Sequence, residues 1–175
     1  MLNSLQYLNF SEHMIEAIKF ALRYDPSPNP RVGAVLVDKN NKIKKITAHK
    51  EKDKDHAEYN LFKNPDITEN DTLYVTLEPC FHDDTSPSCA NAVLETNVQN
   101  IVVGDIDRDE RTNGKGIELL KNNDLNVSIE NGVNDFLNPG YKIKNDKPYL
   151  IGKVATSGDH ICLLYTSPSP RDDCP

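Results

Sequence analysis

The 175-residue sequence has no tryptophan, four cysteines and no apolar run near the ~18 residues of a membrane span. Four cysteines are too few for a disulfide scaffold in a chain of this length. The segment Met1 to Phe10 lacks a basic region followed by an apolar core, so no signal peptide is expected. We therefore expect a cytoplasmic protein without membrane association, whose thiols stay reduced and can bind metal.

Positive charge is also scarce, because 20 Lys and Arg face 27 Asp and Glu, which gives a formal net charge of −7. Affinity for nucleic acid rests on neutralising its phosphates with basic side chains. We therefore expect no nucleic-acid partner and favour a small-molecule substrate, although a local basic pocket could still hold one phosphate. An apolar fraction of 37% suffices for the core of one domain.

Apolar periodicity predicts a first helix over 11–24, where Met14, Ile18 and Leu22 recur at helical spacing and Ser11 can cap the start. A loop with three prolines follows, because proline cannot continue a helix. The sequence then predicts strands at 32–37, 42–47, 72–77, 101–104 and 125–129, and helices at 56–62, 89–96 and 117–122. The second strand is expected at a sheet edge. Strands that alternate with helices predict an α/β domain with a largely parallel sheet.

One histidine and two cysteines have the pattern of an open zinc site. His56, Cys80 and Cys89 are expected to be the metal ligands, which leaves a fourth position for water. Bound zinc lowers the pKa of that water to roughly 7. Glu58, two residues after the histidine, is the expected catalytic proton carrier. A His-x-Glu followed by Pro-Cys-x-x-Cys is typical of zinc deaminases, and here the second half is lengthened to Pro-Cys-x8-Cys.

Each of these residues alone has an ordinary interpretation. His56 could be a surface histidine, Glu58 a solvated helix charge, and the cysteines buried thiols or a loop disulfide. Together they predict one site, because both His56 and Cys89 fall at predicted helix starts beside a strand that ends near Cys80. The edge of the sheet at the carboxyl ends of its strands is where α/β folds place their sites.

The chain resembles the pyrimidine deaminase domain of the bifunctional deaminase/reductase family of riboflavin biosynthesis. The resemblance covers about residues 10 to 160 and rests on Pro28-Asn29-Pro30-Arg31-Val32-Gly33-Ala34-Val35, His49, His56-Ala57-Glu58, the segment from Leu73 through Thr76-Leu77-Glu78-Pro79-Cys80 to His82, Cys89, and Gly114-Lys115-Gly116. The family implies a three-layer α/β/α cytidine-deaminase-like fold around a mixed, largely parallel five-stranded sheet. Neither a monomer nor a homo-oligomer is favoured by the sequence.

The resemblance also implies a reaction. Its substrate would be the phosphorylated pyrimidine 2,5-diamino-6-(5-phosphoribosylamino)pyrimidin-4-one, which would lose its 2-amino group as ammonia and give 5-amino-6-(5-phosphoribosylamino)uracil. Substrate contacts are expected from Asn29, His49, His82, Asp107 and Lys115. For Asn29 and His82, a turn residue and a plain loop histidine are the ordinary alternatives. A deaminase of the deoxycytidylate type and a catalytically dead, zinc-stabilised fragment are the alternative functions.

Two loops depart from the family pattern. Thr85 stands where the family usually carries a basic residue, and Asp109 replaces an Asn. The missing positive charge could come from Arg108, Arg111 or Lys115, although ordinary loop charges are the simpler interpretation of the first two.

The end of the chain resembles only the opening of the family's NADPH-dependent reductase domain. We expect a zinc deaminase domain over 1–145 and a truncated reductase start over 146–160, so that reductase activity is absent. The segment 161–175 contains CLLYTSPSPRD. This string resembles a translated transposase sequencing adapter, so we expect a disordered artefact there.

Overall fold

The computed structural model describes residues 10–63, 66–83 and 87–141. In this part of the chain the elements are, in order, α1 (Glu12–Ala21), β1 (Gly33–Val37), β2 (Ile43–Ala48), α2 (Ala57–Phe62), β3 (Thr72–Val75), α3 (Cys89–Leu94), β4 (Asn100–Val103), α4 (Lys115–Asn122), β5 (Asn126–Ile129) and α5 (Val133–Leu137). The predictions for Thr85, 146–160 and 161–175 lie outside the described residues.

The first helix begins as its sequence predicts. The Ser11 hydroxyl accepts a hydrogen bond from the backbone N–H of Met14 at 3.3 Å, which satisfies one of the donors that a helix start leaves open. The stripe of Met14, Ala17, Ile18 and Ala21 is buried. α1 ends at Ala21, three residues earlier than predicted, before the proline loop.

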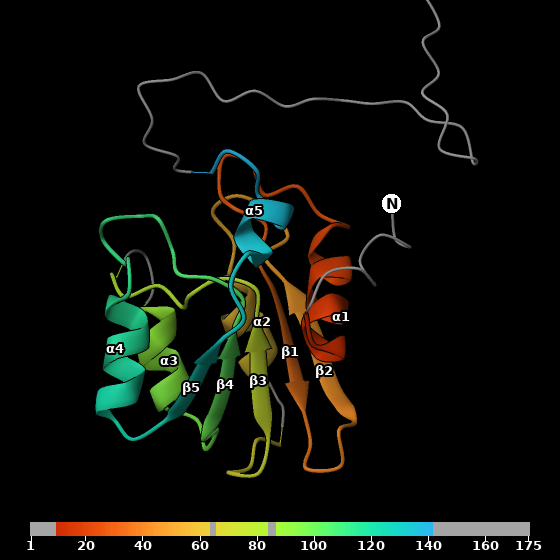
Figure 1. The fold of residues 1–175 in the computed structure, drawn as a ribbon, viewed down its shortest axis with the longest axis vertical. Helices are drawn as coiled ribbons and strands as arrows, with labels where there is room; N and C mark the ends of the chain where they lie inside the picture. The colour runs from red at the N-terminus through yellow and green to blue at the C-terminus, as the bar shows by residue number, and fades with distance from the viewer. Residues whose placement is uncertain (1–9, 64–65, 84–86, 142–175) are drawn as a thin grey trace, which may run out of the picture. The chain divides into compact units, whose positions relative to one another are not determined.

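The five strands form one mixed sheet in the order β2-β1-β3-β4-β5 (Figure 1). β1 runs antiparallel to both of its neighbours, whereas β3, β4 and β5 are mutually parallel. The predicted edge position of β2 is confirmed. Because β1 alone is reversed, its amino end lies at the same sheet edge as the carboxyl ends of β2, β3 and β4. Four loops that are distant in sequence therefore meet at this edge.

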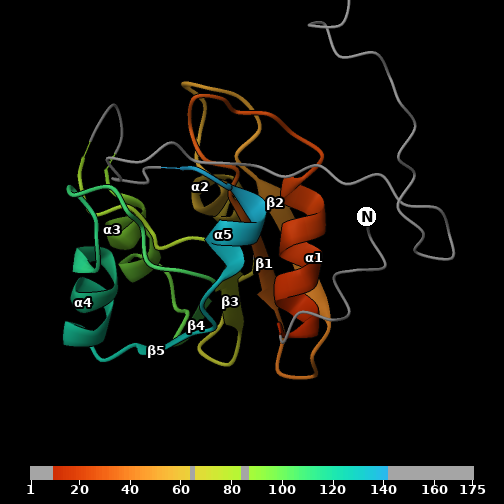
Figure 2. The same ribbon diagram turned by 45° about the horizontal axis from the view of Figure 1, so that its top comes forward.

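Helices cover both faces of the sheet, and successive strand residues alternate between them. One face carries Ala34, Leu36 and Leu73 and packs against α2, α3 and α4. The opposite face carries Val35 and Tyr74 and packs against α1 and α5 (Figure 2). This confirms the three-layer α/β/α architecture and explains why all five residues of β1 are apolar and buried.

The mixed five-stranded sheet confirms the predicted fold class, and two features add detail to it. Only two of the four strand pairings are parallel, because the reversed β1 lies between β2 and β3. The five-residue α5 has no predicted counterpart. Among the described residues, none of the helices combines the length and apolarity needed to cross a bilayer.

Candidate active site

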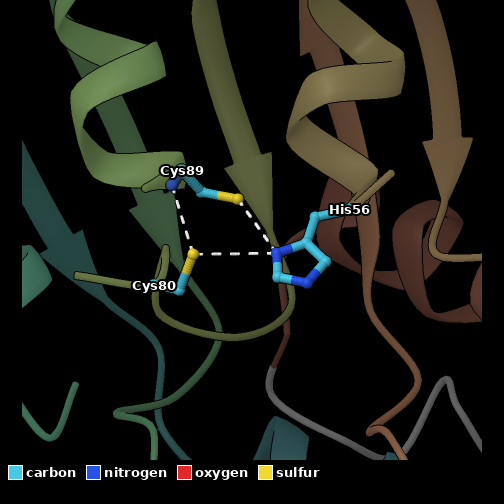
Figure 3. A group of neighbouring side chains, drawn as sticks. All are labelled: His56, Cys80 and Cys89. Carbon is cyan, nitrogen blue, oxygen red and sulfur yellow. Dashed lines mark hydrogen bonds between the residues drawn. The ribbon is translucent and has the colours of Figure 1, made fainter. Parts of the chain in front are cut away.

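The structure brings the three predicted metal ligands together (Figure 3). Nδ1 of His56 lies 3.2 Å from Sγ of Cys89 and 3.6 Å from Sγ of Cys80. All three ligand atoms lie within 4.8 Å of one another. Tetrahedral zinc with ordinary Zn–N and Zn–S bonds would hold a nitrogen and a sulfur about 3.6 Å apart. The donor set and its spacing therefore fit a zinc ion bound through Nδ1.

Three elements position these ligands. His56 is the N-cap of α2, and Cys89 is the first residue of α3, whose start is capped by the Ser88 hydroxyl. Cys80 follows β3, and its sulfur accepts a hydrogen bond from the backbone N–H of Cys89 at 3.2 Å. The backbone of Ala90 also donates to the carbonyl of Cys80 at 3.1 Å. The predicted placement of His56 and Cys89 at helix starts is confirmed.

The two sulfurs are not equivalent in the absence of a cation. The hydrogen bond from the Cys89 side chain lowers the pKa of Cys80 to about 4, despite partial burial. The same contact with Cys80, together with burial, raises the pKa of Cys89. Two adjacent thiolates repel each other, and a bound cation offsets this repulsion. Zinc is the ion that this His/Cys/Cys set suits.

Glu58 lies directly beside the cluster. It is 3% exposed, and its carboxyl group interacts with the side chains of His56, Cys80 and Cys89. Burial raises the pKa of Glu58 to about 7. A carboxylate that is almost excluded from water, beside metal-ligand residues, is not a solvated charge. This excludes the ordinary interpretation of Glu58 as a surface helix charge.

A cavity of about 140 Å³ opens next to the cluster. Of the residues predicted to contact substrate, Asn29, His49, His82 and Asp107 line it, and His56, Cys80 and Glu58 line it too. Lys115 is not among the lining residues, because its ammonium group donates to the carbonyl oxygens of Glu110 at 2.9 Å and Arg111 at 3.5 Å. The substrate-binding roles of these five residues stay predictions.

His49 connects the proline loop, which carries Asn29, to the loop just before α2, which carries Asp55. Its Nδ1 lies 3.2 Å from the carbonyl oxygen of Asp55, and its Nε2 lies 3.3 Å from Nδ2 of Asn29. A carbonyl only accepts, so the network assigns the ring proton to Nδ1 and makes Nε2 an acceptor for the Asn29 amide. Burial lowers the pKa of His49, which agrees with a neutral ring. His49 therefore fixes the orientation of the Asn29 side chain at the cavity wall.

Glu78 is a site residue that the sequence analysis did not single out. It is 3% exposed, and its carboxylate accepts hydrogen bonds from the backbone N–H groups of Asp107 at 3.0 Å, Gly114 at 2.8 Å and Ile117 at 3.1 Å. These bonds tie the loop after β4 and the start of α4 to the segment that carries Cys80. An acidic residue between apolar Leu77 and Pro79, at the end of a buried strand, was the available signal.

Besides its bonds to Glu78, the loop over residues 105–114 makes contacts through Asp107 and Thr112. Asp107 accepts from the backbone N–H of Asp109 at 2.9 Å, and the Tyr141 side chain interacts with its carboxylate. Burial raises the pKa of Asp107, and burial likewise raises the pKa of Tyr141. Buried Thr112 lies 3.3 Å from Nδ1 of His82 and accepts from the backbone of Phe81 at 3.4 Å. Thr112 and Tyr141 are further residues that the sequence analysis missed.

Comparison with known proteins identifies the class. The family model for the "Cytidine and deoxycytidylate deaminase zinc-binding region" matches residues 9–105. The chain is therefore a zinc-binding deaminase domain, as the cluster geometry indicates.

Individual relatives narrow this class. A diaminohydroxyphosphoribosylamino-pyrimidine deaminase of Buchnera aphidicola subsp. Schizaphis graminum is 33% identical over 120 residues, which are 67% of this chain and 81% of that relative. The riboflavin biosynthesis protein RibD of Aquifex aeolicus is 36% identical over 81% of this chain. Acinetobacter baumannii RibD, a solved structure, has a TM-score of 0.67 and 34% identity over 81% of this chain. The chain belongs to the pyrimidine deaminase family of riboflavin biosynthesis.

The extent of the match differs between these relatives. The chain spans 41% of the length of the Aquifex protein and 40% of the Acinetobacter protein, but four fifths of the Buchnera deaminase. The shared part is the deaminase portion, which carries the whole His/Cys/Cys cluster and Glu58.

Proposed function

We propose that this domain hydrolyses 2,5-diamino-6-(5-phosphoribosylamino)pyrimidin-4-one to 5-amino-6-(5-phosphoribosylamino)uracil and ammonia. The observation that carries this proposal is the position of Glu58, buried at the cavity wall beside the side chains of the metal cluster. A purely structural zinc site closes its fourth ligand position and has no use for such a carboxylate. The names of the relatives supply the substrate.

The residues would divide the work as follows. His56, Cys80 and Cys89 would hold zinc, which supplies a Lewis acid that lowers the pKa of a bound water to roughly 7. Glu58 would take one proton from the attacking water and pass it to the ring nitrogen beside the 2-amino carbon. As the carbon–nitrogen bond breaks, Glu58 would deliver the second proton of that water to the amine, which leaves as ammonia while the carbonyl forms.

The lining of the cavity suits a pyrimidine ring. Asn29 can donate and accept hydrogen bonds, and the His49 contact restricts its rotation. The volume of about 140 Å³ is below the roughly 300–1,000 Å³ of typical small-molecule sites. The base would therefore occupy the cavity, while the ribose phosphate would extend from its mouth.

The test is an ammonia-release assay with the full 175-residue chain loaded with zinc. The diaminopyrimidine ribotide, cytidine and deoxycytidylate are offered in parallel. We expect release from the ribotide and a loss of about 10²- to 10⁴-fold in kcat for Glu58→Gln, the usual value of a positioned proton carrier. Exposed Glu69 provides the matched control Glu69→Gln.

Two results would contradict the proposal. Preferential turnover of deoxycytidylate would assign the domain to the nucleotide deaminases instead. Equal activity of Glu58→Gln and Glu69→Gln, with zinc bound in both, would leave the reaction without its proton carrier.

A further inference from the structure

The cavity wall is rich in carboxylates. Glu58, Glu78, Asp107 and Asp109 all line it. Among the described lining residues, Arg111 is the single lysine or arginine. A phosphate-bearing ligand that enters an acidic cavity of a chain with net charge −7 needs a local cation. The distribution of charge thus points to one side chain.

Arg111 is held in place by Asp109. The guanidinium donates from Nε to Oδ1 of Asp109 at 3.1 Å and from Nη2 to Oδ2 at 2.8 Å, and the Arg111 backbone N–H also donates to Oδ1 at 3.0 Å. The Asp109 side chain is 9% exposed, whereas the Arg111 side chain is 60% exposed. A buried carboxylate therefore anchors a guanidinium that reaches the solvent side of the cavity.

This arrangement suits phosphate recognition. A guanidinium is a planar fork of five N–H donors, so one edge can bind a carboxylate while another binds phosphate oxygens. The bidentate contact with Asp109 restricts the rotamers of Arg111 before a ligand arrives, which reduces the entropy lost on binding.

The other two basic residues of this loop contact protein groups and are not part of the cavity lining. Arg108 is paired with Asp135 of α5 and donates to the carbonyl of Tyr141 at 3.3 Å. Lys115 donates to loop carbonyls, including that of Arg111. Neither residue lines the cavity. Lys115 supports the loop that carries Arg111 and does not approach the cavity itself.

We infer that Arg111, positioned by Asp109, is the residue that binds the phosphate of the substrate at the cavity mouth. The identity of the phosphate-bearing ligand rests on the proposed function, but the anion site does not. Arg111 is a specificity-determining residue for phosphorylated over unphosphorylated pyrimidines. It has no part in the deamination step.

The experiment compares zinc-loaded wild type, Arg111→Gln and the matched control Arg108→Gln, all as full chains. Steady-state kinetics are measured with the ribotide and with the corresponding riboside, which lacks the phosphate. Calorimetric titration with ribose 5-phosphate measures anion binding without catalysis. Thermal unfolding verifies that each variant is folded.

Hydrogen bonds to charged groups contribute about 1.5–3 kcal/mol, which corresponds to about 10- to 150-fold in affinity. We therefore expect Arg111→Gln to raise KM for the ribotide, and Kd for ribose 5-phosphate, by about that factor. Its kcat and its kinetics with the riboside should equal those of the wild type. Arg108→Gln should leave all of these values unchanged.

Each remaining outcome is decisive. Equal losses with ribotide and riboside would show that Arg111 acts on the fold of the loop and not on phosphate. Equal losses in Arg108→Gln would show that the general positive charge of the loop, and not a specific site at Arg111, attracts the phosphate. Arg111-dependent binding of ribose 5-phosphate without ammonia release from any wild-type substrate would overturn the proposed function and uphold the anion site. Normal ribotide kinetics in Arg111→Gln would uphold the proposed function and overturn the anion site.

Discussion

Replacing Glu78 with glutamine tests how the structure holds the cavity wall. The carboxylate accepts three backbone N–H groups, two at Oε2 and one at Oε1. An amide retains one acceptor oxygen, so the best rotamer keeps the bonds from Asp107 and Gly114 and turns its NH₂ group toward the N–H of Ile117. One charge-assisted bond is lost and one buried donor is left unpaired, which costs about 2–4 kcal/mol.

Thermal unfolding and kinetics measure the two consequences. For a chain of this size, 2–4 kcal/mol corresponds to a fall in Tm of about 5–15 °C. KM for the ribotide should rise, because the loop that carries Asp107, Asp109 and Arg111 loses its attachment, whereas bound zinc should stay near one per chain. Glu69→Gln, an exposed position, should change stability by less than about 0.5 kcal/mol. A Glu78→Gln protein with the Tm and KM of this control would show that the Glu78 hydrogen bonds do not hold this loop in place.

Two further predictions concern the metal cluster and the buried carboxylates. Zinc at about 100 times its Kd should stabilise the wild type by about 2.7 kcal/mol against thermal unfolding. Cys89→Ser should abolish this stabilisation, whereas Cys174→Ser should retain it; zinc-dependent stabilisation that survives in Cys89→Ser would exclude Cys89 as a ligand. Burial raises the pKa of Asp107 above its ordinary 3.8, so the folded state binds the proton more strongly and the contribution of this group to stability is lost as pH rises. Asp107→Asn should therefore have a higher Tm than the wild type at about pH 7, and this difference should disappear below about pH 4; a constant difference across pH would contradict the assignment.

Much of the fold is encoded locally, which is why the sequence predicts it. Short β-branched apolar runs such as Gly33–Val37 have few alternatives to a buried strand, and Ser11 marks a helix start by itself. The sheet order and the reversal of β1 depend on long-range pairing, so no local pattern indicates them. α5 has five residues, too few for helical periodicity to be recognised.

The candidate site likewise contains some features that local sequence patterns predict and others that they do not. The grouping of His56, Cys80, Cys89 and Glu58 could be predicted because metal chemistry restricts residue type and spacing. Arg108 and Arg111 could not be distinguished by sequence, since both are loop arginines three residues apart. The hydrogen bonds of Asp109 turn one of them to the cavity, and Asp135 holds the other against α5. Lys115, predicted to contact substrate, lies outside the lining because the loop carbonyls bind its ammonium group.

Deamination by this domain can be followed through the fate of one nitrogen atom. The diaminopyrimidine ribotide carries a nitrogen-15 label in its 2-amino group and is incubated with the zinc-loaded chain or its Glu58→Gln variant. We expect labelled ammonia and unlabelled uracil product from the wild type, and a rate about 10²- to 10⁴-fold lower from the variant at equal zinc content. Retention of the label in the pyrimidine, or equal rates from both proteins, would contradict this expectation.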